Sequence, residues 1–209
     1  MHRKWIEYIR IFWDTFMRNV LYRNAVLTAA LGMSVIVATA TTLKNAWIMS
    51  LLFAFTSIPT CLVSSAFFCR VPRYLRAAAV PITAAIFYSI GAIAIRSYFG
   101  AWSTLFRFYL PLVAVNSLML SRAVRYAPQQ TPFEAISDII TCTWGYAAVA
   151  CAVGGVRELL QNGTLGGLRI HMAGVPFFGF IVLGFAAAIV RAVRLRHEQR
   201  QAHKGGGRK

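Results

Sequence analysis

Two pairs of small polar residues interrupt apolar stretches of the chain, and their types and spacing could support binding chemistry. Gly32 and Ser34 lie in the first apolar run, and Asn116 and Ser117 lie in the fourth. Because Gly and Asn weaken a helix, each pair could break its helix and turn backbone groups toward the middle of a membrane. Hydroxyl and carbonyl oxygens placed there would suit a polar solute or a cation. Ordinary packing of small residues between helices explains the same residues without a site and is the alternative.

Acidic and basic residues near the fifth apolar run form a second set of candidates. Glu134 and Asp138 lie four apart where this run begins, on one helical face, so they are expected to stabilise the N-terminus of a helix. An ion pathway is the alternative for the same two acids. Arg157 and Glu158 lie where the run ends, before an Asn-Gly pair that predicts the end of a helix. We expect a buried or interfacial ion pair there.

The remaining reactive side chains predict no catalytic residue and no metal site. The four cysteines show no close metal-ligand spacing and are expected to fill small gaps between helices. A thiol pair or a metal site built from different helices is the alternative. The four histidines lie at a terminus, in a loop or in the tail, and no nucleotide-binding or hydrolase motif is present. The cysteines are Cys61, Cys69, Cys142 and Cys151.

Long apolar runs make up most of the elements that must position these residues. The chain has 209 residues, of which 58% are hydrophobic, and only 6 acidic residues against 22 Lys and Arg. A helix that crosses the bilayer needs about 17 to 25 mostly apolar residues. Six runs meet this requirement: 24–40, 46–68, 75–95, 104–120, 133–156 and 175–193. The sequence therefore predicts an all-α polytopic membrane protein with six transmembrane helices.

The distribution of positive charge predicts how the chain is oriented in the membrane. The formal net charge is +16, and the basic residues gather before the first run, after the second, after the fourth and in the C-terminal tail. These four places lie on one side of the membrane if both termini are cytoplasmic, as the positive-inside rule requires. We therefore expect a multi-pass protein of the bacterial plasma or inner membrane that does not bind nucleic acid.

The order of the elements predicts three parts. Residues 1–23 carry aromatic residues at helical spacing with charges opposite, which indicates an interfacial helix on the lipid surface or, equally, a helix packed on a partner subunit of a complex. Residues 24–195 form the membrane domain, and residues 196–209 form a basic cytoplasmic tail. Six helices divide into repeats of three at about 24–98 and 104–195. An odd number of helices per repeat gives the two repeats opposite orientations in the membrane.

Three sequence elements, taken in order, resemble one known family. They are Leu-Gly-Met-Ser at 31–34, Asn-Ser-x-x-x-Ser-Arg-Ala at 116–123, and Val-Arg-Glu-Leu-Leu-x-Asn-Gly-Thr-Leu at 156–165. They resemble the membrane subunits shared by the Rnf complex and the sodium-pumping NADH:quinone oxidoreductase, Nqr, above all the E subunit of Rnf and the D subunit of Nqr. The resemblance extends from about residue 24 to residue 165.

The resemblance implies a six-helix inverted-repeat subunit that pairs with a homologous sister subunit in a membrane redox complex. In that family, cysteines on the first and fourth helices of both sisters hold a [2Fe-2S] cluster midway through the membrane. This chain has Ser34 and Ser117 at those positions, and Ser121 precedes Arg122 where a glycine is usual. A serine hydroxyl is a weak iron ligand, so we expect no cofactor in this chain, with flavins confined to partner subunits.

Two functions follow as expectations. The first is a non-catalytic, scaffold-like subunit of an ion-translocating electron transport complex, with Ser34, Asn116 and Ser117 at the midplane and Arg122 at the cytoplasmic surface. The second is a small inverted-repeat transporter, or a membrane assembly protein, that has lost electron transfer.

Overall fold

The protein is entirely helical over the residues that the structure describes. This computed structural model describes residues 25–99, 109–163 and 171–206, so the expected leader at 1–23 lies outside the described residues. The elements in chain order are α2 (Ala25–Ala29), α3 (Met33–Thr39), α4 (Leu43–Phe67), η2 (Phe68–Arg70), α5 (Arg73–Phe99), η3 (Leu110–Val113), α7 (Ser117–Ser121), the π-helix η4 (Arg122–Tyr126), η5 (Ala127–Gln129), α8 (Pro132–Asn162), η6 (His171–Gly174) and α9 (Pro176–Gly206).

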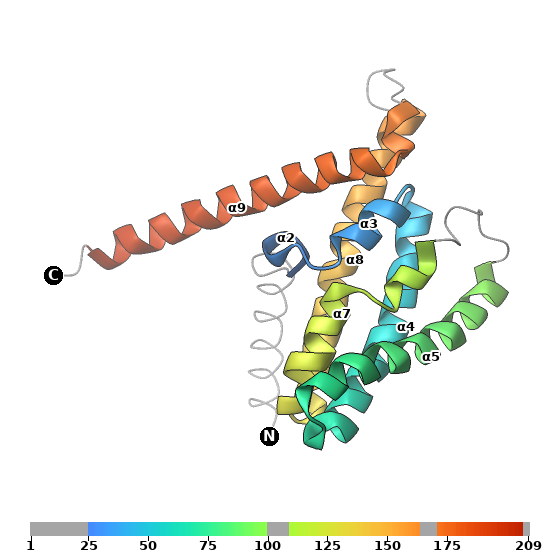
Figure 1. Ribbon diagram of the computed structural model, residues 1–209. Coiled ribbons are helices and arrows are strands. Elements are labelled where there is room, and N and C mark those ends of the chain that lie inside the picture. The colour runs from blue at the N-terminus through green and yellow to red at the C-terminus, as the bar shows by residue number, and fades with distance from the viewer. Residues whose placement is uncertain (1–24, 100–108, 164–170, 207–209) are drawn as a thin grey trace, which may run out of the picture.

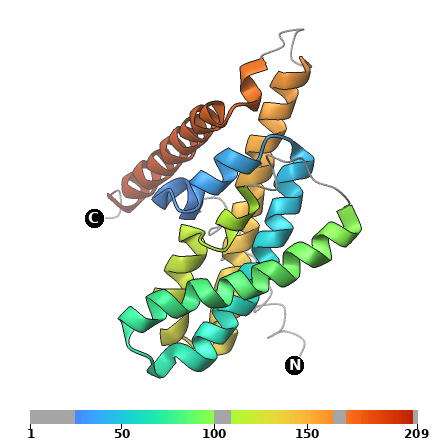
Figure 2. The same cartoon turned by 45° about the vertical axis from the view of Figure 1, so that its right-hand side comes forward.

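Helices α4 and α8 form the centre of the bundle and lie side by side (Figures 1 and 2). They approach closely at Gly154 of α8, where a Cβ atom would lie 2.8 Å from the carbonyl oxygen of Thr42. Farther along the pair, the rings of Phe53 and Tyr146 stack with their centroids 4.3 Å apart. Both aromatic side chains are fully buried, so α4 and α8 are held together by a small residue at one end of their contact and a ring pair at the other.

Local sequence signals determine where these two helices begin and end. Thr42 caps α4 by accepting a hydrogen bond from the Asn45 N–H at 3.2 Å. Thr131 caps α8 through a capping box, in which Glu134 Oε2 accepts a hydrogen bond from the Thr131 N–H at 3.2 Å. Glu134 therefore lies at the helix N-terminus, where the helix dipole stabilises its negative charge. Gly163, with φ of 70°, ends α8.

Four helices among the described residues are long and apolar enough to cross a membrane. They cover Leu43–Arg70, Arg73–Tyr98, Pro132–Asn162 and Pro176–Val193. These ranges coincide with four of the six apolar runs, so the all-α membrane architecture is confirmed at that level. The first run is divided into α2 and α3, and the described part of the fourth is divided into η3 and α7. Within the described residues, the six expected spans thus appear as four long helices and two broken segments.

Helices α5 and α9 each pack on one of the two broken segments. Helix α5 contacts η3, α7 and η4 besides α4, whereas α9 contacts α2 and α3 besides α8. Helix α9 leaves the bundle at a wide angle and continues to Gly206, so the expected boundary between residues 195 and 196 lies inside this helix (Figure 1). Both helices expose large apolar side chains, among them Ile82, Ile93 and Phe185, as expected of surfaces that face lipid or another subunit of a complex.

Candidate functional site at two broken helices

The first apolar segment breaks between α2 and α3. Its backbone enters the left-handed region at Ala30, with φ of 56°, and at Gly32, with φ of 77°. Glycine fits at position 32 for two reasons: it adopts a positive φ without strain, and a Cβ there would lie 2.8 Å from Asn116 Oδ1. Ala30 is a non-glycine residue in the same region and is therefore strained. The break thus depends on the absence of a side chain at Gly32.

The second break lies between η3 and α7, where residues 114–116 belong to no helix. Asn116 has φ of −64° and ψ of 125°, an extended conformation that stops the preceding turn. Its Oδ1 atom accepts a hydrogen bond from the Leu118 N–H at 2.9 Å and so caps α7. Asparagine at this position therefore starts a new short helix instead of continuing the old one.

The two breaks meet in space. The backbone N–H of Gly32 donates a hydrogen bond to Ser117 Oγ at 2.8 Å, although the two residues are 85 positions apart. Asn116 is only 1% exposed, and its Nδ2 atom is buried with no hydrogen-bond partner within the described part of the chain. Ser34, two residues after Gly32, and Ser117 are both exposed. Both helices are broken, as the binding-site interpretation of these residues requires, and their breaks form one polar crossing.

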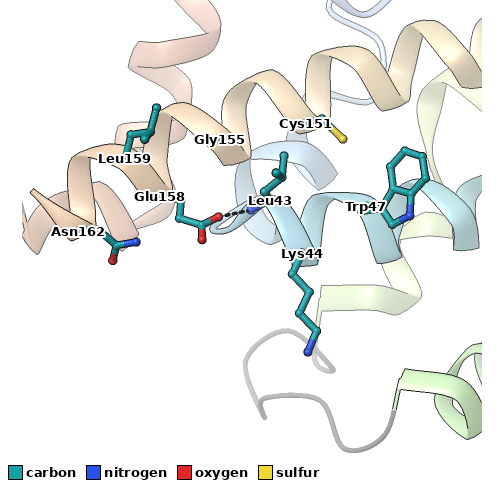
Figure 3. A pocket seen from close by; sticks show the side chains of 8 residues that line it. All are labelled: Leu43, Lys44, Trp47, Cys151, Gly155, Glu158, Leu159 and Asn162. Atoms are coloured by element: carbon teal, nitrogen blue, oxygen red, sulfur yellow. Dashed lines mark hydrogen bonds between the residues drawn. The ribbon is translucent and has the colours of Figure 1, made fainter. Parts of the chain in front are cut away.

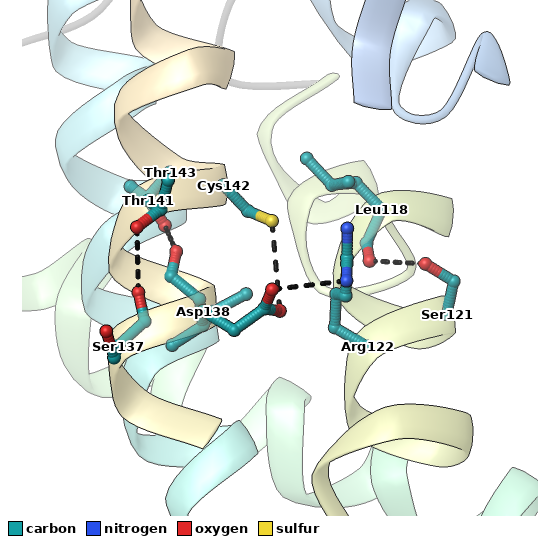
Figure 4. A network of polar contacts seen from close by, with 9 residues as sticks. Leu118, Ser121, Arg122, Ser137, Asp138, Thr141, Cys142 and Thr143 are labelled. Atoms are coloured by element: carbon teal, nitrogen blue, oxygen red, sulfur yellow. Dashed lines mark hydrogen bonds and ion pairs between the residues drawn. The ribbon is translucent and has the colours of Figure 1, made fainter. Parts of the chain in front are cut away.

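An ion pair follows the second break. Arg122 Nη1 lies 3.2 Å from Asp138 Oδ1, and the Cys142 thiol donates to the other carboxylate oxygen at 3.9 Å (Figure 4). Both charged side chains are partly buried, where an unpaired charge would be costly, and each compensates the other's charge. The Arg122 guanidinium also lies 5.6 Å from the centroid of the Tyr126 ring. Partial burial raises the pKa of the Tyr126 hydroxyl. The sequence grouped Asp138 with Glu134 and marked Arg122 as part of the Ser-Arg-Ala element, but it did not predict that the two form an ion pair.

Arg157 is 0% exposed and binds only backbone oxygens. Its Nε, Nη1 and Nη2 atoms donate hydrogen bonds of 2.9 to 3.2 Å to five carbonyl groups. The acceptors lie at the end of α3 and around η6: Val37, Ala40, Ala173, Gly174 and Val175. All five N–H groups of the guanidinium are thus used. Carbonyl groups at helix ends lack helical partners and carry partial negative charge. The guanidinium supplies the missing hydrogen bonds and compensates this charge.

Glu158, the next residue of α8, caps a helix end of the opposite kind. Its Oε2 atom accepts a hydrogen bond from the Leu43 N–H at 2.7 Å, at the first residue of α4. A carboxylate at a helix N-terminus complements the helix dipole, as a guanidinium does at a C-terminus. Within the described residues, Arg157 and Glu158 do not pair with each other, because each binds backbone groups at a remote helix end.

Comparison with known proteins assigns the family. The family model for the Rnf-Nqr subunit, a membrane protein, matches residues 12–188. The chain belongs to the Rnf-Nqr family. This confirms the resemblance drawn from the three sequence elements.

Relatives of this Rnf-Nqr protein match it over nearly their whole length. The E subunit of the ion-translocating oxidoreductase complex of Methanosarcina acetivorans is 26% identical over 91% of the chain and 93% of the relative. The E subunit of the Na(+)-translocating ferredoxin:NAD(+) oxidoreductase complex of Acetobacterium woodii is 23% identical, over 86% and 95%. The E subunit of the proton-translocating ferredoxin:NAD(+) oxidoreductase complex of Clostridium ljungdahlii is 24% identical, over 92% and 94%.

Each of the three resembling elements has a structural role in this Rnf-Nqr protein. The element at 31–34 forms the first break, and the element at 116–123 forms the second. Within the latter, Ser121 Oγ donates to the Leu118 carbonyl oxygen at 2.8 Å (Figure 4). The element at 156–165 supplies Arg157 and Glu158, which hold three helix ends. The motif therefore identified residues that shape the broken segments, although it did not reveal their partners.

The side chains at the crossing do not fit the [2Fe-2S] cluster that the resemblance implies. Such clusters need ionised thiolates, whereas Ser34 and Ser117 offer hydroxyls, and Ser117 Oγ already accepts a hydrogen bond from Gly32. Within residues 25–99, 109–163 and 171–206, no three His, Cys, Asp or Glu side chains are grouped so that they could hold a metal ion. The four cysteines are free thiols on α4, η2 and α8.

Proposed function

We propose that this protein is the E-type membrane subunit of an Rnf/Nqr-type ion-translocating electron transport complex. Its relatives are the E subunits of complexes that are named for Na+ or for proton translocation, and they match nearly the whole chain. The apolar faces of α5 and α9 are suited to lipid and to a sister subunit of homologous fold. Flavins and soluble iron-sulfur clusters belong to other subunits of the complex.

We further propose six membrane-crossing segments in two inverted repeats, with both termini cytoplasmic. The support is a repeated order of elements: a broken segment, a long helix capped by threonine, and a second long helix. The contacts of the last helix in each proposed repeat add further support, because α9 packs on α2 and α3 while α5 packs on η3 and α7. Single cysteines introduced on either side of the membrane test this topology, since an impermeant maleimide labels only the cysteines on the outer face of sealed vesicles.

Within the complex, the protein acts as a scaffold at the midplane and does not hold the iron-sulfur cluster. The observation that carries this proposal is the bond from the Gly32 N–H to Ser117 Oγ. At the position where the family places an iron ligand, this chain uses a hydroxyl to join its two broken helices. Hydroxyls stay protonated near neutral pH and bind iron weakly, so they suit a structural role better than a ligand role.

Co-purification from native membranes tests membership of the complex. A tagged chain extracted in mild detergent is expected to bring down a homologous six-helix subunit and at least one flavin-containing subunit. Absence of both contradicts the proposal. Electron flow through the reconstituted complex then tests the scaffold role, since Ser34→Ala is expected to leave the rate unchanged. Ser117→Ala removes the bond to Gly32 and is expected to lower thermal stability without abolishing electron flow.

A second candidate is a transporter or assembly protein, favoured by the buried Nδ2 atom of Asn116. A buried donor without a partner invites an acceptor, and a polar solute held at the crossing would provide one. Solute uptake into proteoliposomes that is lost in Ser34→Val and Ser117→Val would support transport. Uptake no greater than that of empty vesicles, with a full set of redox subunits copurified, would eliminate it.

A further inference from the structure

A pocket of about 770 Å³ lies between the first turns of α4 and the last turns of α8 (Figure 3). Its polar residues, Lys44, Glu158 and Asn162, come from the ends of the two helices. Trp47 and Gly155 line it one turn deeper. This volume is within the range of about 300 to 1,000 Å³ that is typical of small-molecule sites. The pocket is therefore polar where the helices end and apolar toward the middle of the span.

A narrower pocket of about 160 Å³ continues the first along the same two helices. It shares Trp47 with the first pocket and is lined mainly by apolar side chains, among them Ile58, Ile140 and Trp144. Lys44 and Ile58 lie 14 residues apart on α4, which corresponds to about 21 Å along the helix axis. The two pockets adjoin at Trp47, and we refer to them together as the groove. Charged residues line its mouth at the helix ends, and apolar residues line the path farther along the two helices.

The mouth of the groove is lined by one residue of each charge, Lys44 and Glu158. Leu43 donates its N–H to Glu158 Oε2 at 2.7 Å, so the carboxylate lies beside the first turn of α4 (Figure 3). Lys44, the next residue of α4, also lines the pocket. A carboxylate has about four acceptor positions, and this bond uses one of them. An ammonium group offers three donors. The mouth can therefore bind a phosphate through Lys44 and an N–H donor cation through Glu158.

We propose that this groove binds one molecule of phosphatidylethanolamine. The headgroup phosphate pairs with Lys44, the primary ammonium donates to Glu158, and one acyl chain follows the apolar path beside Trp47. A phosphatidylcholine ammonium has no N–H to donate, and phosphatidylglycerol carries no cation for the carboxylate. The two charged residues therefore select the ethanolamine headgroup over the other two headgroups. The apolar path selects the intact lipid over the free headgroup.

Native mass spectrometry of the full chain in detergent tests this assignment. The protein is mixed with equal amounts of phosphatidylethanolamine, phosphatidylglycerol and phosphatidylcholine that carry the same acyl chains. We expect the ethanolamine lipid to be retained at least about fivefold over either other lipid, which corresponds to about 1 kcal/mol. Glycerophosphoethanolamine, which lacks acyl chains, is expected to give no adduct. Equal retention of the three lipids, or an adduct with the soluble headgroup, overturns the proposal.

Two variants locate the lipid. Lys44→Gln is expected to lower retention of phosphatidylethanolamine to that of phosphatidylcholine, and a preference that survives it overturns the headgroup assignment. Gly155→Leu fills the pocket with little disturbance of the fold, because a Cβ at Gly155 would meet only Leu43 Cδ1 at 4.0 Å. It is expected to abolish retention, and retention that persists overturns the location. Arg96→Gln, at an exposed basic residue near the end of α5, is the matched control and should change nothing.

Discussion

Replacing Arg157 by Met should destabilise the protein by about 3 to 5 kcal/mol. The side chain makes five hydrogen bonds to carbonyl groups, and a hydrogen bond between helices in a membrane protein stabilises by about 0.6 kcal/mol on average. Five such bonds give about 3 kcal/mol. The carbonyl groups left buried without partners move the effect toward the upper figure. Arg157→Lys keeps a cation with three donors, so at least two bonds are lost and we expect a cost of about 1 kcal/mol or more.

The assay is reversible unfolding of the detergent-solubilised protein by a denaturing detergent, followed by tryptophan fluorescence and circular dichroism. Arg96→Met is the control, because Arg96 is an exposed basic residue on α5. The expected order of stability is wild type, Arg96→Met, Arg157→Lys and then Arg157→Met. If Arg157→Met unfolds within about 1 kcal/mol of the control, the five carbonyl bonds do not hold the ends of α3 and η6.

Two further predictions concern the crossing and the ion pair. Gly32→Ala should cost at least about 1 to 2 kcal/mol, because it places a Cβ at positive φ and 2.8 Å from Asn116 Oδ1. Gly184→Ala, where a Cβ meets nothing within 4 Å, is its control, and equal melting temperatures for the two variants would contradict the close approach. A spectrophotometric difference titration of wild type against Tyr126→Phe should place the pKa of Tyr126 above 10.0, since burial opposes the phenolate. The Arg122 guanidinium opposes that rise, so Arg122→Gln should move the midpoint higher still, and a downward shift would refute the placement.

The long helices and the two breaks could be predicted from the sequence because their causes are local. Apolar runs of sufficient length predict the four long helices. Gly32 and Asn116 act on their own backbone, one through a positive φ and the other through a cap on the next turn. The sequence alone could not choose between a binding site at the broken helices and ordinary packing of small residues, since both use the same residue types. The positive φ at Gly32 and the non-helical residues before α7 show the two breaks, and the bond from Gly32 to Ser117 joins them.

The partners of the charged residues could not be predicted, because they are backbone groups or side chains brought near by the fold. Arg157 binds carbonyl groups that become free only where α3 ends, 120 positions earlier in the chain. Its neighbour Glu158 carries the opposite charge, so adjacency in the sequence suggested an ion pair. In the structure Glu158 instead accepts a hydrogen bond from the N–H of Leu43 at the start of α4. Asp138 likewise pairs with Arg122 on a short π-helix, which no periodicity in the sequence marks.

Iron and acid-labile sulfide analysis, together with EPR of the reduced protein purified with its sister subunit, tests the loss of the iron ligands most directly. With hydroxyls at both family ligand positions, we expect no [2Fe-2S] signal that depends on this chain. The matched variants are Ser34→Ala and Ser117→Ala, which should leave the metal content of the preparation unchanged. A stoichiometric [2Fe-2S] signal that disappears in either variant would show that serine holds the cluster and would contradict the scaffold role.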